Sequence, residues 1–143
     1  MGKLYDTDIV AWAEQQAAFL RRGEWSRLDI ANLAEEIEDV GKSEQRELHS
    51  RMAVLLSHLL KWQFQPDLRG KSWRSTIALQ RRLIARRVRK TPSLKHLLVD
   101  EQWLEDVWEE AATFAIGETG IDEFPEDPIW TVDNILDPAF FPD

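Results

Sequence analysis

The sequence predicts an all-α protein, a single antiparallel bundle of about four helices around a long central helix, with a packed Pro-rich C-terminal tail. Apolar residues recur at three- and four-residue spacing, the period of a helix with one buried face, and the two-residue alternation of strands is almost absent. The 143 residues are enough for one hydrophobic core without disulfides or metals. We therefore expect residues 1–143 to fold as one helical domain.

The first helix is predicted over about residues 7–22. Asp6 or Thr7 provides a side chain of the type that caps a helix N-terminus, and Gly23 stands where a glycine commonly ends a helix. Helical spacing places six residues on the face that we expect to be buried: Ile9, Trp12, Ala13, Gln16, Phe19 and Leu20.

A long central helix is predicted over residues 29–64. One stripe keeps its phase across Gly41, where a turn would reset it, so we expect one helix, bent at most at this glycine. From Met52 onward apolar residues occupy most sides of the helix, which predicts that residues 52–64 form the centre of the bundle. The predicted stripe consists of Ile30, Leu33, Ala34, Ile37, Gly41, Glu44, Leu48, Met52, Leu55, Leu59 and Trp62.

A short connection at residues 65–71 leads into the next predicted helix. Ser72 is expected to cap this helix, which continues to Lys90. Because the connection is short, the helix is expected to fold back antiparallel on residues 52–64. Its inner face is predicted to hold Trp73, Ile77, Ile84 and Val88.

A last long helix and a tail complete the predicted bundle. Thr91-Pro92 breaks the chain, and Ser93 is expected to cap a helix over about residues 94–116. The tail, residues 121–143, contains four prolines and one short helix after Thr131. Its aromatic and aliphatic residues are too numerous for a free tail, so we expect it to pack along the bundle.

Composition excludes several classes of function. The chain has no cysteine, which excludes thiol catalysis, disulfides and thiolate metal sites. The first ten residues contain no apolar run, so we expect no signal peptide, and the longest apolar stretch falls far short of the roughly 20 residues that span a bilayer. We expect a cytoplasmic protein with no cofactor and no membrane contact.

Charge is strongly segregated along the chain. The net charge of −8 argues against non-specific binding of nucleic acid. Residues 69–90 nevertheless carry nine basic side chains and no acidic one, whereas the rest of the chain carries 9 basic and 26 acidic side chains. This segregation is the sharpest functional signal in the sequence.

Several short motifs follow one another in order along nearly the whole chain. They are Tyr5-Asp6, Trp12, Leu28-Asp29, Leu33, Glu35-Glu36-Ile37-Glu38, His58-Leu59-Leu60-Lys61-Trp62, Ser72-Trp73-Arg74, Thr76-Ile77, Pro92-Ser93-Leu94, Glu118-Thr119-Gly120, Phe124-Pro125 and Phe140-Phe141-Pro142. The pattern resembles a bacterial family known as domain of unknown function 29. The resemblance implies a small helical fold and no established activity, cofactor or catalytic residue. Glu126-Asp127 departs from it by being more acidic.

Two Gly-Lys-Ser tripeptides, at residues 41–43 and 70–72, do not predict a phosphate-binding loop. That loop needs a second glycine five positions earlier, where Glu36 and Gln65 stand, and neither tripeptide follows a predicted strand. The histidines predict no metal site either, because His49 and His58 lie nine residues apart and point to opposite sides of one helix.

His58 and Trp62 form a candidate pocket on the central helix, where they lie one turn apart. A histidine between Val54 and Trp62 on one ridge of a helix is a candidate general acid or base. However, one histidine without a positioned nucleophile or a second carboxylate is not a mechanism, so a packed, hydrogen-bonded histidine is the preferred interpretation.

The start of the basic helix is the candidate site for an anion. A helix N-terminus presents free N–H groups, and basic side chains gather there from the helix and from across the hairpin. Further along, Arg82, Arg86 and Arg89 form one outward row, unless acidic residues 100–110 neutralise it from within the fold. The anion-binding candidates are Lys61, Arg69, Lys71, Ser72, Trp73 and Arg74.

We expect a non-enzymatic helical module for protein interaction or regulation, with an unknown protein partner. The alternative is a binder of an anionic ligand or nucleic acid through residues 61–90, whose affinity should fall as salt rises. An enzyme using His58 ranks third.

Overall fold

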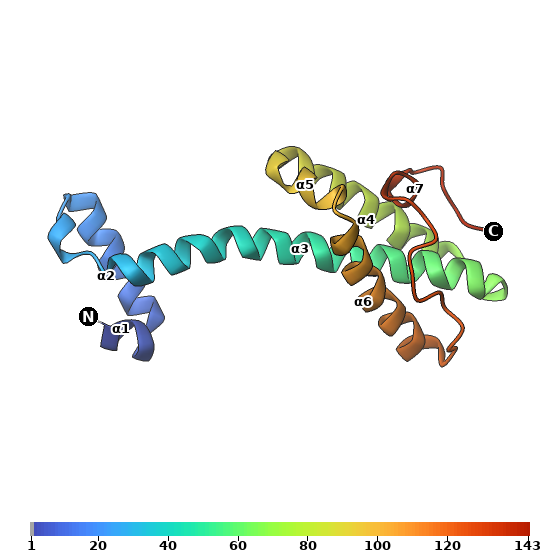
Figure 1. Cartoon of the computed structure of the whole chain (residues 1–143), viewed down its shortest axis with the longest axis horizontal. Helices are drawn as coiled ribbons and strands as arrows, with labels where there is room; N and C mark the ends of the chain where they lie inside the picture. Colours follow the sequence, from blue (N-terminus) through green and yellow to red (C-terminus); the bar gives the residue numbers. More distant parts are fainter. Residues whose placement is uncertain (1) are drawn as a thin grey trace. The chain divides into compact units, whose positions relative to one another are not determined.

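The computed structural model describes residues 2–143, with side chains from Leu4 onward. The described residues form helices and connections without a strand, which confirms the all-α prediction (Figure 1). Contacts divide the chain into two compact units, Met1–Glu44 and Gln45–Asp143. None of the described helices has the length and hydrophobicity needed to cross a membrane. The elements are α1 Gly2–Thr7, α2 Ile9–Arg22, η1 Trp25–Arg27, α3 Ile30–Phe64, η2 Pro66–Leu68, α4 Lys71–Lys90, η3 Pro92–Leu94, α5 Lys95–Leu98, α6 Glu101–Thr119 and α7 Val132–Leu136.

The first unit is built around a small, partly polar core. Trp12 and Phe19 of α2 are buried, and the indole Nε1 of Trp12 donates to the Asp29 carboxylate at 3.0 Å. The backbone N–H of Asp29 donates to the Gln16 side chain at 2.8 Å, which ties α2 to the start of α3. Asn32 donates to the same carboxylate, and this hydrogen bond lowers the pKa of Asp29 although burial raises it.

Helix α2 ends as predicted and begins differently. Asp8, rather than Asp6 or Thr7, caps it and accepts from the Ala11 N–H at 3.1 Å. Gly23 ends the helix with a left-handed φ of 69°. The predicted buried stripe is only half right, because a unit this small covers only the side of α2 that carries Trp12, Gln16 and Phe19. The exposed members of the stripe are Ile9, Ala13 and Leu20.

Helix α3 runs unbroken from Ile30 to Phe64, which confirms the prediction of one helix through Gly41. A Cβ added at Gly41 would meet no atom within 4 Å, so this glycine is an exposed position in the helix interior. The predicted stripe is buried from Leu48 onward, but its earlier members Ile30, Ala34 and Ile37 are exposed, contrary to the prediction. That residues 1–143 form a single helical domain stays a prediction.

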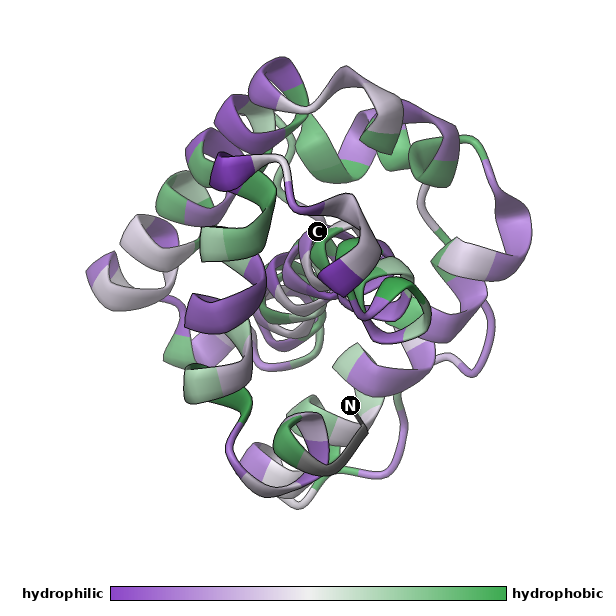
Figure 2. Ribbon diagram, turned by 90° about the vertical axis from the view of Figure 1, so that its left-hand side faces the viewer, coloured by the Kyte–Doolittle hydropathy of each residue, from purple (hydrophilic) through white to green (hydrophobic). Residues whose placement is uncertain are grey.

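The second unit packs around residues 48–62 of α3, as the sequence predicts. The fully buried residues of this stretch meet residues of α4, α6 and α7 in one hydrophobic cluster. Figure 2 shows hydrophobic and hydrophilic segments on the same helices, as expected of amphipathic helices around a core. The largest members of the cluster are Leu48, Met52, Leu55, Leu56, Leu59, Leu60, Ile77, Ile84, Trp108 and Ile135.

Helix α4 folds back antiparallel on α3, as predicted (Figure 1). Arg87, near its end, lies 3.6 Å from Glu47, whereas Arg74, near its start, lies over the ring of Trp62. The prediction that Ser72 caps α4 is wrong. The helix begins one residue earlier, at Lys71, because Gly70 has an extended backbone whose carbonyl accepts from the Arg74 N–H at 3.1 Å.

The last long helix is divided into two, contrary to the prediction of one helix over residues 94–116. Residues 92–98 form η3 and the short α5, and the chain then breaks at Val99. Asp100, rather than Ser93, provides the cap, because its side chain accepts from the N–H groups of Gln102 and Trp103 at the start of α6.

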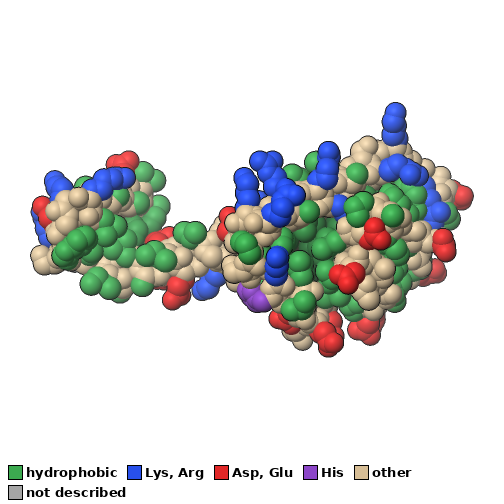
Figure 3. Space-filling view, turned by 90° about the horizontal axis from the view of Figure 1, so that it is seen from above, with side chains coloured by type: hydrophobic (Ala, Val, Ile, Leu, Met, Phe, Trp, Pro, Cys, Tyr) green, Lys and Arg blue, Asp and Glu red, His purple; other side chains and the backbone are tan. Residues whose placement is uncertain are grey.

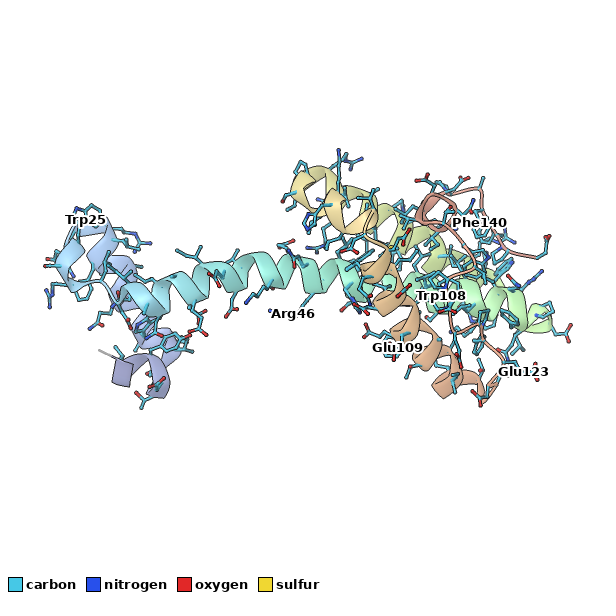
Figure 4. All side chains as sticks on the ribbon, in the orientation of Figure 1. Trp25, Arg46, Trp108, Glu109, Glu123 and Phe140 are labelled. Atoms are coloured by element: carbon cyan, nitrogen blue, oxygen red, sulfur yellow. The ribbon has the colours of Figure 1, made fainter. Side chains whose placement is uncertain are left out.

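The tail packs on the second unit, as predicted, with its short helix α7 after Thr131. Phe124 and Ile135 are buried. The indole N–H of Trp108 on α6 donates to the carbonyl of Pro125 at 2.8 Å, and the ring of Trp130 lies between those of Trp108 and Phe140, at 5.2 and 5.7 Å (Figure 4).

Candidate interaction surface on α4

His58 is a half-buried residue of α3 whose ring is fixed by its own helix. Its Nδ1 lies 2.8 Å from the carbonyl oxygen of Val54, so Nδ1 carries the proton and donates. Burial lowers the pKa of His58, and the nearby charge of Lys61 lowers it further. The hydroxyl of neighbouring Ser57 donates to the same carbonyl at 2.8 Å, so it is not held as a nucleophile by the imidazole. The predicted pocket partner Trp62 is buried, whereas His58 is half-buried.

Lys61 is buried and its ammonium is engaged inside the fold. It donates to the Glu118 carboxylate at the end of α6 and lies 5.3 Å from the ring centroid of Trp73. A buried ammonium requires such a partner, because an unpaired charge in the interior is strongly unfavourable. The structure thus brings two anion-binding candidates, Lys61 and Trp73, together with a carboxylate from the same chain.

Arg69 and Arg74 meet on the ring of Trp62. Their guanidinium carbons lie 5.3 and 5.2 Å from its centroid, and Arg74 lies equally close to Phe141 of the tail. Arg69 also donates from Nε to the carbonyl of Trp62 at 2.6 Å and from its terminal nitrogen to the carbonyl of Asp143 at 2.9 Å. These two arginines therefore hold the tail against the start of α4.

Lys71 and Ser72, the remaining anion-binding candidates, lie exposed in the first turn of α4. The six candidates gather at one end of the second unit, but three of them already contact a carboxylate, a carbonyl or an aromatic face of this chain. Anion binding at these residues stays a prediction.

Arg81 is a buried arginine that the sequence does not single out. Its side chain points inward from the middle of α4 and is only 5% exposed. It donates to the carbonyls of Ile135 at 2.9 Å, Phe140 at 2.7 Å and Pro138 at 3.4 Å. Burial lowers the pKa of Arg81, partly offset by the charge of Asp137. One side chain thus fixes three points of the tail.

The arginines on the neighbouring side of α4, beginning with the adjacent Arg82, face outward instead. Arg82, Arg86 and Arg89 are exposed, and the described residues give none of them an ion pair. A groove of about 530 Å³ on this side is lined only by apolar and basic residues of α4: Leu79, Arg82, Leu83, Ala85, Arg86 and Arg89. Figure 3 shows Lys and Arg side chains grouped along one edge of the second unit, with Asp and Glu mostly along the opposite edge.

A second groove, of about 480 Å³, continues this surface toward the tail. Arg82 and Ala85 line both grooves, and the second is completed by Ala78, Arg81, Leu136, Pro138 and Phe141. Neither groove contains an acidic residue. We call the residues of the first groove the α4 outer face.

Comparison with known proteins identifies the family. The profile of the family described as "Domain of unknown function DUF29" matches residues 4–141. The chain belongs to this family. No curated protein and no solved structure matches the chain. The DUF29 resemblance seen in the motifs is therefore confirmed, and no activity is attached to it.

The acidic side of α6 in this DUF29 chain does not neutralise the α4 outer face. Glu110 pairs with His49 of α3, and Asp100 caps its own helix. Gln102 donates to Asp106, also within α6. Arg87 of α4 pairs instead with Glu47 of α3, on the inner side. The arginine row predicted from the sequence is therefore open.

No metal centre forms among the described residues, since no group of three or more His, Asp or Glu side chains converges. His49, His58 and His96 each lie in a separate environment, next to Glu110, Val54 and Ser93 respectively.

Proposed function

We propose that this protein is a non-enzymatic interaction module that binds an acidic, amphipathic helix of a partner protein along the α4 outer face. The observation that carries the proposal is the row of three outward arginines beside the exposed Leu79 and the half-buried Leu83, with no carboxylate of the described chain paired to the arginines. A chain with 26 acidic residues does not use any of them to cover this row.

Chemistry of the surface favours a helix over a small ligand. Leu79 is 42% exposed, and Leu83 and Ala85 extend the apolar strip alongside the arginines. Such a strip matches a helix that presents apolar residues at three- and four-residue spacing with Asp or Glu at its edges. The arginines then supply charge-assisted hydrogen bonds to carboxylates, with bidentate geometry available to each.

Nucleic acid, the alternative, would use the same arginines differently. Arg82 to Arg89 spans about 10 Å of helix at 1.5 Å per residue, a length that faces only a few phosphates. The rest of the chain carries 26 acidic and 9 basic side chains outside residues 69–90, and this negative excess disfavours a long polyanion. A protein partner with a short acidic helix satisfies both conditions, which are the short length of the arginine row and the negative charge of the rest of the chain.

The two alternatives are separated by anisotropy measurements on the full chain. The probes are a labelled helical peptide with Leu at i, i+3, i+4, i+7 and Glu at its edges, a scrambled peptide of the same composition, and double-stranded DNA of matched charge. We expect binding of the patterned peptide only. Tighter binding of DNA, with a steep loss of affinity as salt rises, would favour the nucleic-acid alternative.

Matched charge reversals locate the surface. Arg82→Glu with Arg86→Glu should weaken peptide binding by tenfold or more, because each removes one charged contact and adds a repulsive one. Lys42→Glu with Arg46→Glu is the control, since it also reverses two exposed basic residues one turn apart on a helix. Figure 4 shows Arg46 on the side of α3 turned away from α4. Equal loss of binding in both pairs would contradict the proposed surface.

A further inference from the structure

The first third of α3 carries an apolar face that nothing in the described chain covers. Ile30 and Ile37 are each 70% exposed and Val40 is 68% exposed, although all three are β-branched apolar residues. Ala34, between the isoleucines, and Gly41, one turn beyond Ile37, lie exposed on the same side. Figure 3 shows uncovered hydrophobic side chains over the first unit. We call Ile30, Ala34, Ile37 and Gly41 the α3 seam.

The seam alternates large and small residues at four- and three-residue spacing. This is the spacing at which one helix meets another along a shared axis. No atom lies within 4 Å of a Cβ added at Gly41, so the surface there is open and leaves room for a large side chain of a partner.

A second copy of the same helix, running antiparallel, brings a large side chain to this point. If Ala34 faces Ile37 of the other copy, Ile30 faces Gly41, and every large residue lies opposite a small one. The same register sets Leu33 beside Val40 at one edge of the contact and Glu38 beside Ala31 at the other. No residues of like charge face each other, and the opposed helix dipoles attract.

A parallel pair fails the same tests. It would place isoleucine against isoleucine and glycine against glycine, so that large residues crowd one another and small ones face small ones. The pattern of residue sizes along the seam therefore selects a two-fold, antiparallel contact, and two-fold contacts are the commonest form of homodimer. We propose that two copies of this chain pair antiparallel through the α3 seam.

The size of the contact sets its strength. Three large apolar side chains per copy, each about two-thirds exposed, offer on the order of 100 Å² apiece. With the small residues and the edges of the helix, the total reaches roughly 1,000 Å², the lower end of specific interfaces. We therefore expect a reversible dimer with a micromolar dissociation constant.

Sedimentation equilibrium on the full chain, from about 1 μM to 1 mM, tests the association. The unmodified protein should shift from monomer to dimer within this range, and Ile37→Glu should stay monomeric with an unchanged circular dichroism spectrum. Val99→Glu is the matched control, because Val99 is 83% exposed and lies outside the seam. A monomer throughout, or a dimer that survives Ile37→Glu, would overturn the proposal.

The absence of cysteine allows the register to be tested by single-cysteine variants. In the antiparallel register the two Ala34 Cα atoms lie roughly 6 Å apart at an interaxial distance of about 8 Å, within disulfide range. Ala34→Cys should therefore form a disulfide-linked dimer on oxidation. Glu35→Cys, on the outer side of the helix, and Gly41→Cys, displaced by eleven residues from its own copy, should not. Rapid crosslinking of Gly41→Cys would show a parallel pair and refute the antiparallel register.

These tests are independent of the proposed function. The seam lies at residues 30–41, and the proposed peptide site lies at residues 79–89. Peptide binding that persists in Ile37→Glu leaves the proposed function intact whatever the oligomeric state.

Discussion

Replacing Arg81 by methionine tests how the tail is held on the second unit. Methionine keeps an unbranched apolar side chain and removes the guanidinium, which lies over the ring of Phe141 and donates to three carbonyls. Two of those hydrogen bonds are short, at 2.9 and 2.7 Å, and the side chain is almost fully buried. Hydrogen bonds from a charged donor contribute about 1.5–3 kcal/mol each, and bonds from one side chain do not add fully. We expect Arg81→Met to lower the free energy of unfolding by about 3 kcal/mol.

Urea denaturation, with hydrogen exchange of the tail amides, measures the effect. The control is Arg82→Met, which changes the adjacent, exposed arginine and should alter the free energy of unfolding by less than about 0.5 kcal/mol. Arg81→Lys keeps one charge but cannot serve three carbonyls, so it should fall between the unmodified protein and Arg81→Met. Equal stability and equal protection of residues 135–140 in Arg81→Met and Arg82→Met would refute the role given to Arg81.

Three further predictions concern the pKa of Tyr5, the helix at Gly41 and the binding of phosphate. Tyr5 donates to Glu36 at 2.5 Å, and this bond, with burial and nearby acids, raises the pKa of Tyr5 to about 12. Because Tyr5 is the only tyrosine, the absorbance at 295 nm should titrate near pH 12, and nearer 10 in Glu36→Gln. The free energy of unfolding should decrease as the pH rises from about 10 to about 12, because over this range the unfolded chain has lost the proton and the folded chain still holds it. Gly41→Ala, on an Ile37→Glu background that removes self-association, should raise the free energy of unfolding by about 0.5–1 kcal/mol, whereas a lower melting temperature would contradict a continuous helix. Phosphate should raise the melting temperature no more than chloride at matched ionic strength, because Lys61 and Arg74 already have partners; a specific phosphate effect that Arg74→Ala abolishes would instead support the predicted anion site.

Regular helices with a buried stripe could be predicted from the sequence. The unbroken phase across Gly41 correctly indicated one helix from Ile30 to Phe64, and the spacing of Ile77 and Ile84 correctly indicated the inner face of α4. In both cases many residues repeat one period, so a single atypical residue does not hide the pattern.

Helix starts were harder to predict, because more than one nearby residue can be of a type that caps a helix. Ser93 after Pro92 is a good cap by residue type, yet Asp100 provides the cap of α6, because its carboxylate reaches two N–H groups. Likewise an apolar stripe indicates which face a helix buries but not whether the chain supplies a cover. Ile30 and Ile37 fit the buried pattern and remain exposed.

The candidate site was predicted in part. The outward row of Arg82, Arg86 and Arg89 follows from helical spacing alone, and the structure leaves it open. The inward role of Arg81 depends on where the tail docks, and carbonyl oxygens 54 to 59 residues away leave no pattern in the sequence. A buried arginine among eight other basic residues carries no local signal that separates it from the exposed ones.

A charge-swap experiment tests the interaction surface most directly. The patterned acidic peptide and its Lys-for-Glu counterpart are titrated into the unmodified chain and into Arg82→Glu with Arg86→Glu. Our interpretation predicts that the unmodified chain binds only the acidic peptide and that the double variant binds only the basic one, because the apolar strip of Leu79 and Leu83 is common to both. Unchanged preference for the acidic peptide in the double variant would contradict binding at the α4 outer face.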